Sequence, residues 1–578
     1  MASRLLFFAF FLLAGFTLRT SAQPLVTRAP WYETAADSTS ITITWSVPNT
    51  IGTELFWGLT LQYELGDKPS AVNPDGSDTL TATISGLRPA TCYYIKVRTV
   101  GTNLDSITFV ASTASDYRST DSILVFFNRS VDSTSYPNLP HANGNTALLP
   151  MLLDRIAAAT HSIDLALYSF TGSTGTAVGQ ALMTAQQRGI KVRMIVDSAS
   201  VAGSSAYALV RDAGIPIIRN SFGNNGTVAS YIHHNKFIIL DGREDDGRNV
   251  WVEAGSWNLS DEQTTTDYQN VLLIQDLALA RAYEREFNQE WGSSGDQPDP
   301  VNARFSTHKL DITPRSFWLR KPGTDKLIET HLLFSPNRGC ASSIDFELKQ
   351  ARQQILYALF VFTRSDLAQD MILQHSHGLD IHGIVNDTDQ YEQTPMLRQA
   401  GIDALRFTGG ANVLLHHKYC LLDAGYDIAT VITGSFNWSA TAEQHNSENL
   451  LIIKDKDIAG QYFQEFLQRY RENGGTASIS YPKSSVPSYP SNLPKPSSLR
   501  LYPNPSSGPI RIAWNQLRAG EVRVSVLDEA GRCVEDFMTQ GIEGENQYFL
   551  ALPLPLGCYR IVVQHDAMNE QAGVELLH

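Results

Sequence analysis

Apolar and polar positions alternate with a period of two along the early part of the chain. Residues 41–45 read Ile-Thr-Ile-Thr-Trp, and residues 80–85 and 93–100 continue the alternation. A β-strand turns successive side chains to opposite faces, so this pattern predicts strands that bury one face in a core. We therefore expect an all-β domain over residues 24–115, with Trp45 in its interior.

The middle of the chain, residues 120–474, mixes short apolar runs with segments of helical periodicity. Apolar side chains recur at helical spacing in residues 147–159, and the run 162–168 has the composition of a buried strand. A second helix is expected over residues 176–188, because the glycine that follows is a typical helix stop. Alternating strands and helices predict a mostly parallel sheet with helices on its faces.

This middle region contains an internal repeat. Residues 189–197 read Gly-Ile-Lys-Val-Arg-Met-Ile-Val-Asp, and residues 378–386 read Gly-Leu-Asp-Ile-His-Gly-Ile-Val-Asn. Self-similarity of this kind marks a duplicated unit. We therefore expect a multidomain protein with a central duplicated α/β/α domain, its first repeat over residues 120–295 and its second over residues 326–474.

The two ends of the chain differ from the middle. Residues 475–498 are rich in serine and proline, which predicts an extended linker, and residues 499–578 alternate again, which predicts a second β-sandwich. At the start, Arg4 precedes an apolar run and a set of small residues, the pattern of a secretory signal, which we place at residues 1–22. The apolar run is too short for an ordinary membrane span, and we expect no transmembrane segment later in the chain.

Composition narrows the classes of function. The chain has 43% hydrophobic and 18% charged residues, as folded proteins do. Its formal net charge of −14 argues against a general nucleic-acid binder, which is usually basic. The 5 cysteines are scattered along the chain without the spacing of a metal site or of a disulfide framework.

Each repeat carries one polar motif, His-x-Lys-x-x-x-x-Asp followed by a Gly-Ser-x-Asn turn. Residues two apart on a strand point to one face, so each histidine lies on the same side as its lysine. The neighbouring His233 and His417 are then turned to the opposite face. Just before a closing asparagine, the first repeat has Gln269 and the second has Glu448. The motif members are His234, Lys236, Asp241, Ser256 and Asn258 in the first repeat, and His416, Lys418, Asp423, Ser435 and Asn437 in the second.

These residue types fit chemistry at phosphorus. A neutral imidazole can attack phosphorus, and an imidazolium can protonate a leaving oxygen. Ammonium and carboxamide groups can hold the charged oxygens of the transition state. Two copies of the motif supply a nucleophile, an acid and a doubled set of donors, so we expect no metal and no other cofactor.

At these motifs the chain resembles the phospholipase D superfamily, over about residues 122–474. The resemblance implies one active site on a pseudo-twofold axis between the repeats of a monomer, with a covalent phosphohistidine intermediate. It assigns the nucleophile to His234 and the acid to His416. Asp241 and Asp423 belong to the motif, and we expect them to be structural. The phosphate oxygens would be bound by Lys236, Lys418, Asn258 and Asn437, with Ser256 and Ser435 supporting the turns.

One position departs from the family pattern, which has a carboxylate to orient each histidine. Glu448 fits this pattern, whereas Gln269 does not. If each orienting residue serves the histidine of its own repeat, the Glu448 carboxylate keeps His416 protonated as the acid. The neutral Gln269 then leaves His234 uncharged and ready to attack. The alternative is that Gln269 marks a first site that has partly decayed.

The flanking domains carry two further resemblances. Residues 86–93, Gly-Leu-Arg-Pro-Ala-Thr-Cys-Tyr, resemble the tyrosine corner of a fibronectin type III sandwich. Residues 501–505, Leu-Tyr-Pro-Asn-Pro, together with Gly557 and Tyr559, resemble a type IX secretion sorting domain. This second resemblance implies contact with the type IX secretion machinery and release from the cell or attachment to its outer surface, after signal removal. The alternative for residues 499–578 is an ordinary β-sandwich used in adhesion.

Together these patterns predict a secreted phosphodiesterase of phospholipase D type. Export and the acidic composition favour phospholipids as substrates. Residues 434–439, Gly-Ser-Phe-Asn-Trp-Ser, also resemble the branch of small nucleases and cardiolipin hydrolases, so a nuclease acting on DNA or RNA is the alternative. An alternative of another class is a catalytically inactive surface adhesion protein whose catalytic fold has become a binding module. The complete motifs oppose it, because a binding module needs no paired nucleophile and acid.

Overall fold

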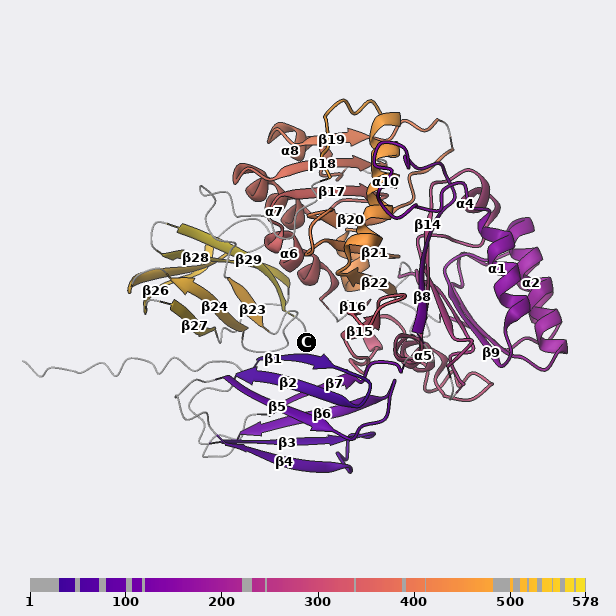
Figure 1. Ribbon diagram of the computed structural model, residues 1–578, viewed down its shortest axis with the longest axis horizontal. Coiled ribbons are helices and arrows are strands. Elements are labelled where there is room, and N and C mark those ends of the chain that lie inside the picture. The colour runs from indigo at the N-terminus through magenta and orange to yellow at the C-terminus, as the bar shows by residue number, and fades with distance from the viewer. Residues whose placement is uncertain are drawn as a thin grey trace, which may run out of the picture.

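The computed structural model describes most of the chain as three consecutive folded parts, a β-sandwich, a duplicated α/β domain and a second β-sandwich (Figure 1). The predicted signal segment, 1–22, lies outside the described residues, as does 482–498 of the predicted linker. The described residues are 31–46, 52–71, 79–99, 106–116, 120–220, 231–244, 247–336, 339–386, 391–410, 412–481, 499–502, 510–516, 519–527, 533–542, 544–550, 557–565 and 568–576.

The N-terminal domain is a sandwich of two antiparallel sheets, with the strand orders β1-β2-β5 and β4-β3-β6-β7. Trp45 is fully buried in its core. The hydroxyl of Tyr93 accepts a hydrogen bond from the backbone N–H of Arg88 at 2.8 Å. The buried tryptophan and this tyrosine corner confirm the prediction. The strands are β1 (Trp31–Ala36), β2 (Ser40–Ser46), β3 (Gly52–Gly58), β4 (Gly66–Ala71), β5 (Thr79–Ser85), β6 (Cys92–Thr99) and β7 (Ser106–Ser112).

The first repeat of the central domain is one mixed sheet with the order β11-β10-β9-β12-β13-β14-β8. Helices α1, α2 and α3 share a core with its outer face, and α5 packs on its inner face, which meets the second repeat. The strands are β8 (Thr120–Phe127), β9 (Ser162–Leu167), β10 (Lys191–Val196), β11 (Ile217–Arg219), β12 (Lys236–Leu240), β13 (Trp251–Gly255) and β14 (Asn270–Asp276). The helices are α1 (Leu148–Ala158), α2 (Gly172–Gln187), α3 (Ser205–Asp212), α4 (Asp261–Thr265) and α5 (Leu277–Trp291).

The second repeat has the order β15-β16-β22-β21-β20-β17-β18-β19, with α6 to α9 on its outer face and α10 on its inner face. A short 3-10 helix, Ser306–His308, lies in the connection between the repeats. The strands are β15 (Ser316–Arg320), β16 (Leu327–Ser335), β17 (Gln354–Leu359), β18 (Asp380–Val385), β19 (Asp403–Arg406), β20 (Lys418–Leu422), β21 (Thr430–Gly434) and β22 (Glu448–Ile453). The helices are α6 (Cys340–Gln350), α7 (Ser365–Ser376), α8 (Thr394–Gln399), α9 (Ala440–Gln444) and α10 (Lys456–Glu472).

The prediction of a mostly parallel sheet is wrong. Only β9, β10 and β11, and their counterparts β17, β18 and β19, pair in parallel within the described strands. The strands that carry the motifs pair antiparallel, as β12-β13-β14 and β20-β21-β22. Parallel neighbours need a crossover of about a dozen residues or more, and the connections from β12 to β13 and from β20 to β21, residues 241–250 and 423–429, are shorter than that.

The two repeats are joined through one apolar core. It contains the inner faces of both sheets together with α5 and α10. The ring of Tyr283 on α5 contacts Phe237 of β12 and Phe334 of β16, with centroid separations of 4.9 and 5.3 Å. Figure 1 shows α1 and α2 on the far side of the first repeat, and α6 to α8 on the far side of the second. The motif strands therefore lie in the middle of the domain.

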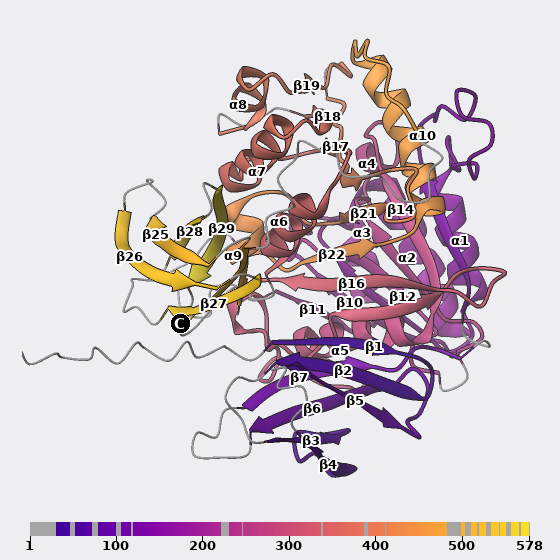
Figure 2. The ribbon, with the colours of Figure 1, turned by 60° about the vertical axis from the view of Figure 1, so that its left-hand side comes forward.

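Both flanking domains lie against the central domain (Figure 2). On α5, Arg281 donates to the carbonyl of Ala90 and Arg285 donates to the hydroxyl of Tyr94, each at 2.8 Å. In the C-terminal sandwich, β29 lies beside α6. Its sheets have the orders β23-β24-β27 and β26-β25-β28-β29. The strands are β23 (Arg500–Tyr502), β24 (Ile510–Gln516), β25 (Gly520–Leu527), β26 (Cys533–Gly541), β27 (Gly544–Leu550), β28 (Gly557–His565) and β29 (Met568–Leu576).

Among the helices of the described residues, none combines the length and the apolar composition needed to cross a membrane.

Candidate active site

Three segments of each repeat meet at one edge of its sheet. In the first repeat these are the start of β12, the end of β13 and the start of β14. Their antiparallel order brings His234, the turn after Gly255 and Gln269 to the same edge. The start of β20, the end of β21 and the start of β22 do the same for the second motif.

The two edges are joined to each other by backbone hydrogen bonds. The N–H of His234 donates to the carbonyl of Ser447 at 2.9 Å. The N–H of His416 donates to the carbonyl of Tyr268 at 3.1 Å. Each motif histidine therefore lies beside the residue that precedes the orienting position of the other repeat.

Because of this pairing, the orienting residue of each repeat contacts the histidine of the other repeat. Nδ1 of His234 lies 2.6 Å from Oε2 of Glu448, and Nδ1 of His416 lies 3.1 Å from Oε1 of Gln269. All four side chains are buried, and the two histidines retain 5% and 4% of their exposure. The assumption that each orienting residue serves the histidine of its own repeat is wrong. The backbone pairing is the reason, because it sets Glu448 beside His234 and Gln269 beside His416.

The hydrogen bonds also determine the tautomers of the two imidazoles. Nδ1 of His416 faces the carbonyl of Ser256 at 3.0 Å as well as Gln269, and both are acceptors. Nδ1 of His234 faces a carboxylate, so Nδ1 carries the proton in both rings. Within the described part of the chain, no side chain hydrogen-bonds to Nε2 of either ring, which leaves that nitrogen available for chemistry.

Burial and neighbouring cations lower the pKa of both histidines. Burial lowers the pKa of His234 to about 4, although the Glu448 carboxylate opposes this shift. The pKa of His416 falls well below its usual value, because the charges of Lys418, Lys236 and His234 add to the effect of burial. Both imidazoles are therefore neutral at neutral pH in this structure. The prediction that Glu448 holds a proton on His416 is wrong, because that carboxylate contacts the other histidine.

The two motif lysines are buried, and each contacts the backbone of its own histidine. Nζ of Lys236 donates to the carbonyl of His234, and Nζ of Lys418 donates to the carbonyl of His416, each at 2.8 Å. Burial lowers the pKa of Lys236 to about 7, and burial together with the charge of Lys236 lowers the pKa of Lys418 well below its usual value. An anion placed between these ammonium groups would relieve their mutual repulsion, so the pair is suited to hold a phosphate.

The two turn asparagines present their amide oxygens to the buried interior. In the described residues, Oδ1 of Asn258 and Oδ1 of Asn437 have no hydrogen-bond partner. Nδ2 of Asn258 donates to Oε1 of Gln263 at 3.2 Å. Their predicted contact with phosphate oxygens stays a prediction.

The turn serines fasten each turn to the strand that follows. Oγ of Ser256 accepts from the backbone N–H of Asn270, and Oγ of Ser435 accepts from that of Asn449, each at 3.0 Å. Ser256 also donates to Oε1 of Gln269 at 2.7 Å. These bonds fix the residues next to the imidazoles, and the supporting role of the two serines in the reaction stays a prediction.

The motif aspartates lie at the other ends of β12 and β20, away from the imidazoles. Asp241 accepts from three consecutive backbone N–H groups, among them those of His161 at 2.7 Å and Ser162 at 3.0 Å. Asp423 does the same, with Gln353 at 2.7 Å and Gln354 at 3.0 Å. Each carboxylate satisfies the donors of a turn that leads into a central strand, and the structural role expected for both aspartates stays a prediction.

Three side chains that contact the site were not predicted. Gln263 on α4 accepts from Nε2 of Gln269 at 2.7 Å and so fixes the amide that faces His416. It lies in a short polar helix, and nothing in the local pattern marks it. The rings of Tyr168 and Phe360 lie 4.9 and 4.7 Å from those of His234 and His416. These two aromatic residues occupy matching positions, directly after β9 and β17. An alignment of the two repeats would therefore have identified them as a corresponding pair.

Comparison with known proteins assigns the three parts of the chain to families. Residues 152–291 and 344–470 match the family described as cardiolipin synthase, phospholipase D-like domain. Mitochondrial cardiolipin hydrolase of Mus musculus is 30% identical over 173 residues, which cover 30% of this chain and 67% of that protein. The chain belongs to the phospholipase D superfamily. Residues 31–109 match the fibronectin type III domain, and residues 500–572 match the secretion system C-terminal sorting domain.

Other members of the superfamily match shorter parts of the chain. Mitochondrial cardiolipin hydrolase of Xenopus tropicalis is 33% identical over 129 residues, 22% of this chain. The match spans 58% of that protein's own length, and matches to the relatives from Danio rerio and Canis lupus familiaris span 52% and 54% of theirs. Among solved structures, the phospholipase D family member Nuc from Salmonella typhimurium is 25% identical with a TM-score of 0.22. That match covers 29% of this chain and 93% of Nuc.

These matches fix the general class of the protein. The central domain is homologous to phosphodiesterases of the phospholipase D superfamily, which supports a hydrolase. The sorting domain implies export from the cell or to its surface.

Proposed function

We propose that this phospholipase D-like protein is a metal-free phosphodiesterase that hydrolyses phospholipids through a phosphohistidine on His234. The observation that carries this proposal is the unequal pairing of the two imidazoles, Glu448 with His234 and Gln269 with His416. A nucleophilic imidazole becomes cationic as the N–P bond forms, and a carboxylate on its Nδ1–H stabilises that charge. An acid must release its proton, and a neutral amide on its Nδ1 does not hold that proton back.

In the first step, Nε2 of His234 attacks phosphorus and the bond to the leaving oxygen breaks. The leaving oxygen takes a proton from Nε2 of His416, and an alcohol departs. In the second step, neutral His416 takes a proton from a water molecule whose oxygen attacks phosphorus. The N–P bond breaks, its electron pair returns to His234, and a phosphomonoester is released.

His416 must carry a proton at the start of the first step. Its low pKa has two main causes, burial and the positive charges of Lys418 and Lys236. A phosphodiester anion bound among these cations offsets their repulsion of a further proton. Substrate binding therefore favours the protonated state that His416 needs.

Phospholipids are the proposed substrate class. An acidic exported protein meets membrane and extracellular lipids, and its net charge of −14 opposes the long polyanion of a nucleic acid. The matched relatives include proteins named cardiolipin hydrolase and phospholipase D. Because one chain holds both half-sites, we expect the monomer to be active.

The test is a substrate panel with a metal chelator present throughout. The substrates are phosphatidylcholine, phosphatidylglycerol, cardiolipin, plasmid DNA, single-stranded DNA and bis(p-nitrophenyl) phosphate. We expect release of phosphatidic acid from phospholipids, and a radiolabelled phosphorus trapped on His234 after rapid denaturation at alkaline pH, where an N–P bond survives. Label on His416 would overturn the assignment of roles, faster cleavage of DNA would favour the nuclease, and complete loss of activity in chelator would count against metal-free chemistry.

A further inference from the structure

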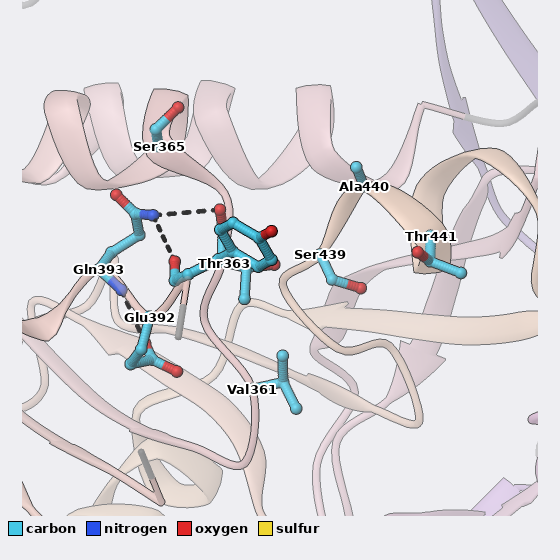
Figure 3. Close-up of a pocket in the computed structure, with 9 residues that line it drawn as sticks. Val361, Thr363, Ser365, Glu392, Gln393, Ser439, Ala440 and Thr441 are labelled. Carbon is cyan, nitrogen blue, oxygen red and sulfur yellow. Dashed lines mark hydrogen bonds between the residues drawn. The ribbon is translucent and has the colours of Figure 1, made fainter. Parts of the chain in front are cut away.

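A cavity of about 650 Å³ lies beside the second half of the site (Figure 3). Three segments form its walls: the start of α7 with the residues before it, the residues that precede α8, and the start of α9. In Figure 3, Glu392 and Gln393 lie on one side of the cavity, and Ser439, Ala440 and Thr441 lie on the other.

One wall of the cavity adjoins a residue that contacts His416. The ring of Phe360 lies 4.7 Å from the ring of His416, and the next residue, Val361, lines the cavity. The N–H of Trp438 donates to the carbonyl of Val361 at 3.2 Å, which ties this wall to the turn that carries Asn437. The cavity therefore belongs to the repeat that carries His416, and its wall is joined to the segments that hold Phe360 and Asn437.

The duplicated fold explains why the cavity exists in this half. The bridge between Phe170 and Leu259 in the first repeat corresponds to the bridge between Phe362 and Trp438 in the second. By this alignment, Asp261 on α4 corresponds to Ala440 on α9.

In the first repeat, Asp261 spans the space between the two helix starts. It accepts from the backbone N–H groups of Ser173 and Thr174 at 2.9 and 2.7 Å, and from the hydroxyl of Ser173 at 2.8 Å. Contact is so close that a Cβ atom on Gly172, whose φ is +67°, would lie 2.5 Å from Oδ2 of Asp261. In the second repeat the methyl group of Ala440 is too short to cross the gap, and the cavity lies there.

The lining of the cavity is hydroxylic and carries no cation. Ser365, Ser439 and Thr441 contribute hydroxyl groups, Gln393 an amide and Glu392 a carboxylate. Glu392 is fixed in place, because its carboxylate accepts from the backbone N–H groups of Phe362 at 3.2 Å and Gln393 at 3.0 Å. None of the described lining residues is lysine, arginine or histidine. Such a lining matches a ligand with several hydroxyl groups and disfavours a second phosphate.

We propose that this cavity binds the alcohol that leaves phosphorus, and that this alcohol is an uncharged polyol of the glycerol class. The proposal rests on the proposed function, in which His416 protonates the leaving oxygen. A leaving group that receives its proton from His416 must lie on the side of His416, where the cavity is. The favoured substrates are therefore phospholipids with a glycerol-type head group, rather than nucleic acids, whose leaving strand carries further phosphates.

The same site serves an acceptor alcohol when the reaction runs as transfer. The hydroxyl of a bound polyol gives its proton to Nε2 of neutral His416, and its oxygen attacks the phosphohistidine. A new P–O bond forms, the N–P bond breaks, and the product is a phosphodiester of the acceptor.

The decisive variant is Ala440→Asp, which reproduces in the second repeat the arrangement around Asp261. Ala440 is exposed at the start of a short helix, where an acidic residue is well tolerated. The matched control is Thr265→Asp, which adds the same charge to an exposed position on α4. Two lipids that differ only in head group, phosphatidylglycerol and phosphatidylmethanol, serve as substrates in the same vesicles.

We expect Ala440→Asp to lower kcat/KM for phosphatidylglycerol at least about tenfold relative to phosphatidylmethanol, while Thr265→Asp leaves the ratio unchanged. We also expect the wild type to transfer phosphatidyl groups to glycerol in preference to ethanol, and the variant to lose this preference. Equal effects on both lipids, no effect on either, or faster turnover of phosphatidylcholine than of phosphatidylglycerol by the wild type would overturn the polyol site. Absence of activity towards every diester, including bis(p-nitrophenyl) phosphate, would instead overturn the proposed function on which it rests.

Discussion

Oε2 of Glu448 lies 2.6 Å from Nδ1 of His234, a residue of the opposite repeat. The contact joins a carboxylate that is fully buried to an imidazole that is almost fully buried. It gives the two histidines different partners, although their motifs are the same, and it is the basis of the roles proposed for them.

Glu448→Gln removes the charge but keeps an oxygen acceptor for Nδ1 of His234. We expect kcat to fall about 10²-fold or more, because the ring loses stabilisation as it becomes cationic. Rapid-quench measurement of phospho-enzyme formation should place the loss in the first step. Gln269→Glu is the matched exchange at His416, and an equal slowing of the first step by both variants would contradict the division of roles.

The dependence of kcat/KM on pH should be bell-shaped. His234 attacks only when neutral, so activity should rise as the pH increases through its pKa of about 4. Lys236 holds phosphate and His416 acts as the acid only when protonated, so activity should fall as the pH increases, with the pKa of Lys236, about 7, as the upper bound of that fall. A profile measured with bis(p-nitrophenyl) phosphate in chelator checks both limbs.

Lys236→Arg tests the origin of the basic limb. Arginine stays charged throughout the accessible range, so the variant should be less active but should lose less activity above neutral pH. If the fall in activity at high pH occurs at the same pH in this variant as in the wild type, the fall reports the titration of another group, such as His416.

Asp241→Ala should destabilise the protein without changing the chemistry of the folded fraction. It leaves the backbone N–H groups of residues 160–162 without their acceptor, at a cost of about 1–3 kcal/mol for a buried donor. Thermal unfolding should shift to lower temperature, while kcat per folded molecule stays close to the wild-type value. Asp241→Asn keeps one oxygen in place and should cost less. A large loss of kcat at unchanged stability would give Asp241 a chemical role.

The fibronectin type III domain should be released by changes on α5 that leave the site intact. Arg281 and Arg285 provide two of its polar contacts with the central domain. The double variant Arg281→Ala/Arg285→Ala should increase proteolytic cleavage between the domains, with little change in turnover of bis(p-nitrophenyl) phosphate. Unchanged cleavage would mean that other contacts hold the domain.

Much of the site could be predicted because the relative positions of its residues depend on short spacings within one strand or one motif. The period of a strand places His234 beside Lys236, and the repeat of the motif predicts a second copy around His416. The crossing of Glu448 and Gln269 could not be predicted in the same way. It depends on backbone hydrogen bonds between segments far apart in the sequence, and no spacing within one repeat reveals them.

The sheet order shows the same division. The parallel strands β9, β10 and β11 are separated by helical patterns that the sequence displays. No helix lies between β12 and β13, which pair antiparallel. The expectation that strands and helices alternate throughout the domain therefore predicted parallel pairing for strands that are antiparallel. Gln263 was missed because its role depends on the position of Gln269, which only the folded chain provides.

The crossed contacts also bear on how a gene duplication can diverge. A point mutation at the orienting position of one copy changes the surroundings of the histidine in the other copy. A substitution in one half therefore affects the chemistry of the other half. Two identical ancestral halves could become specialised through a single such change, with both original histidines and lysines retained.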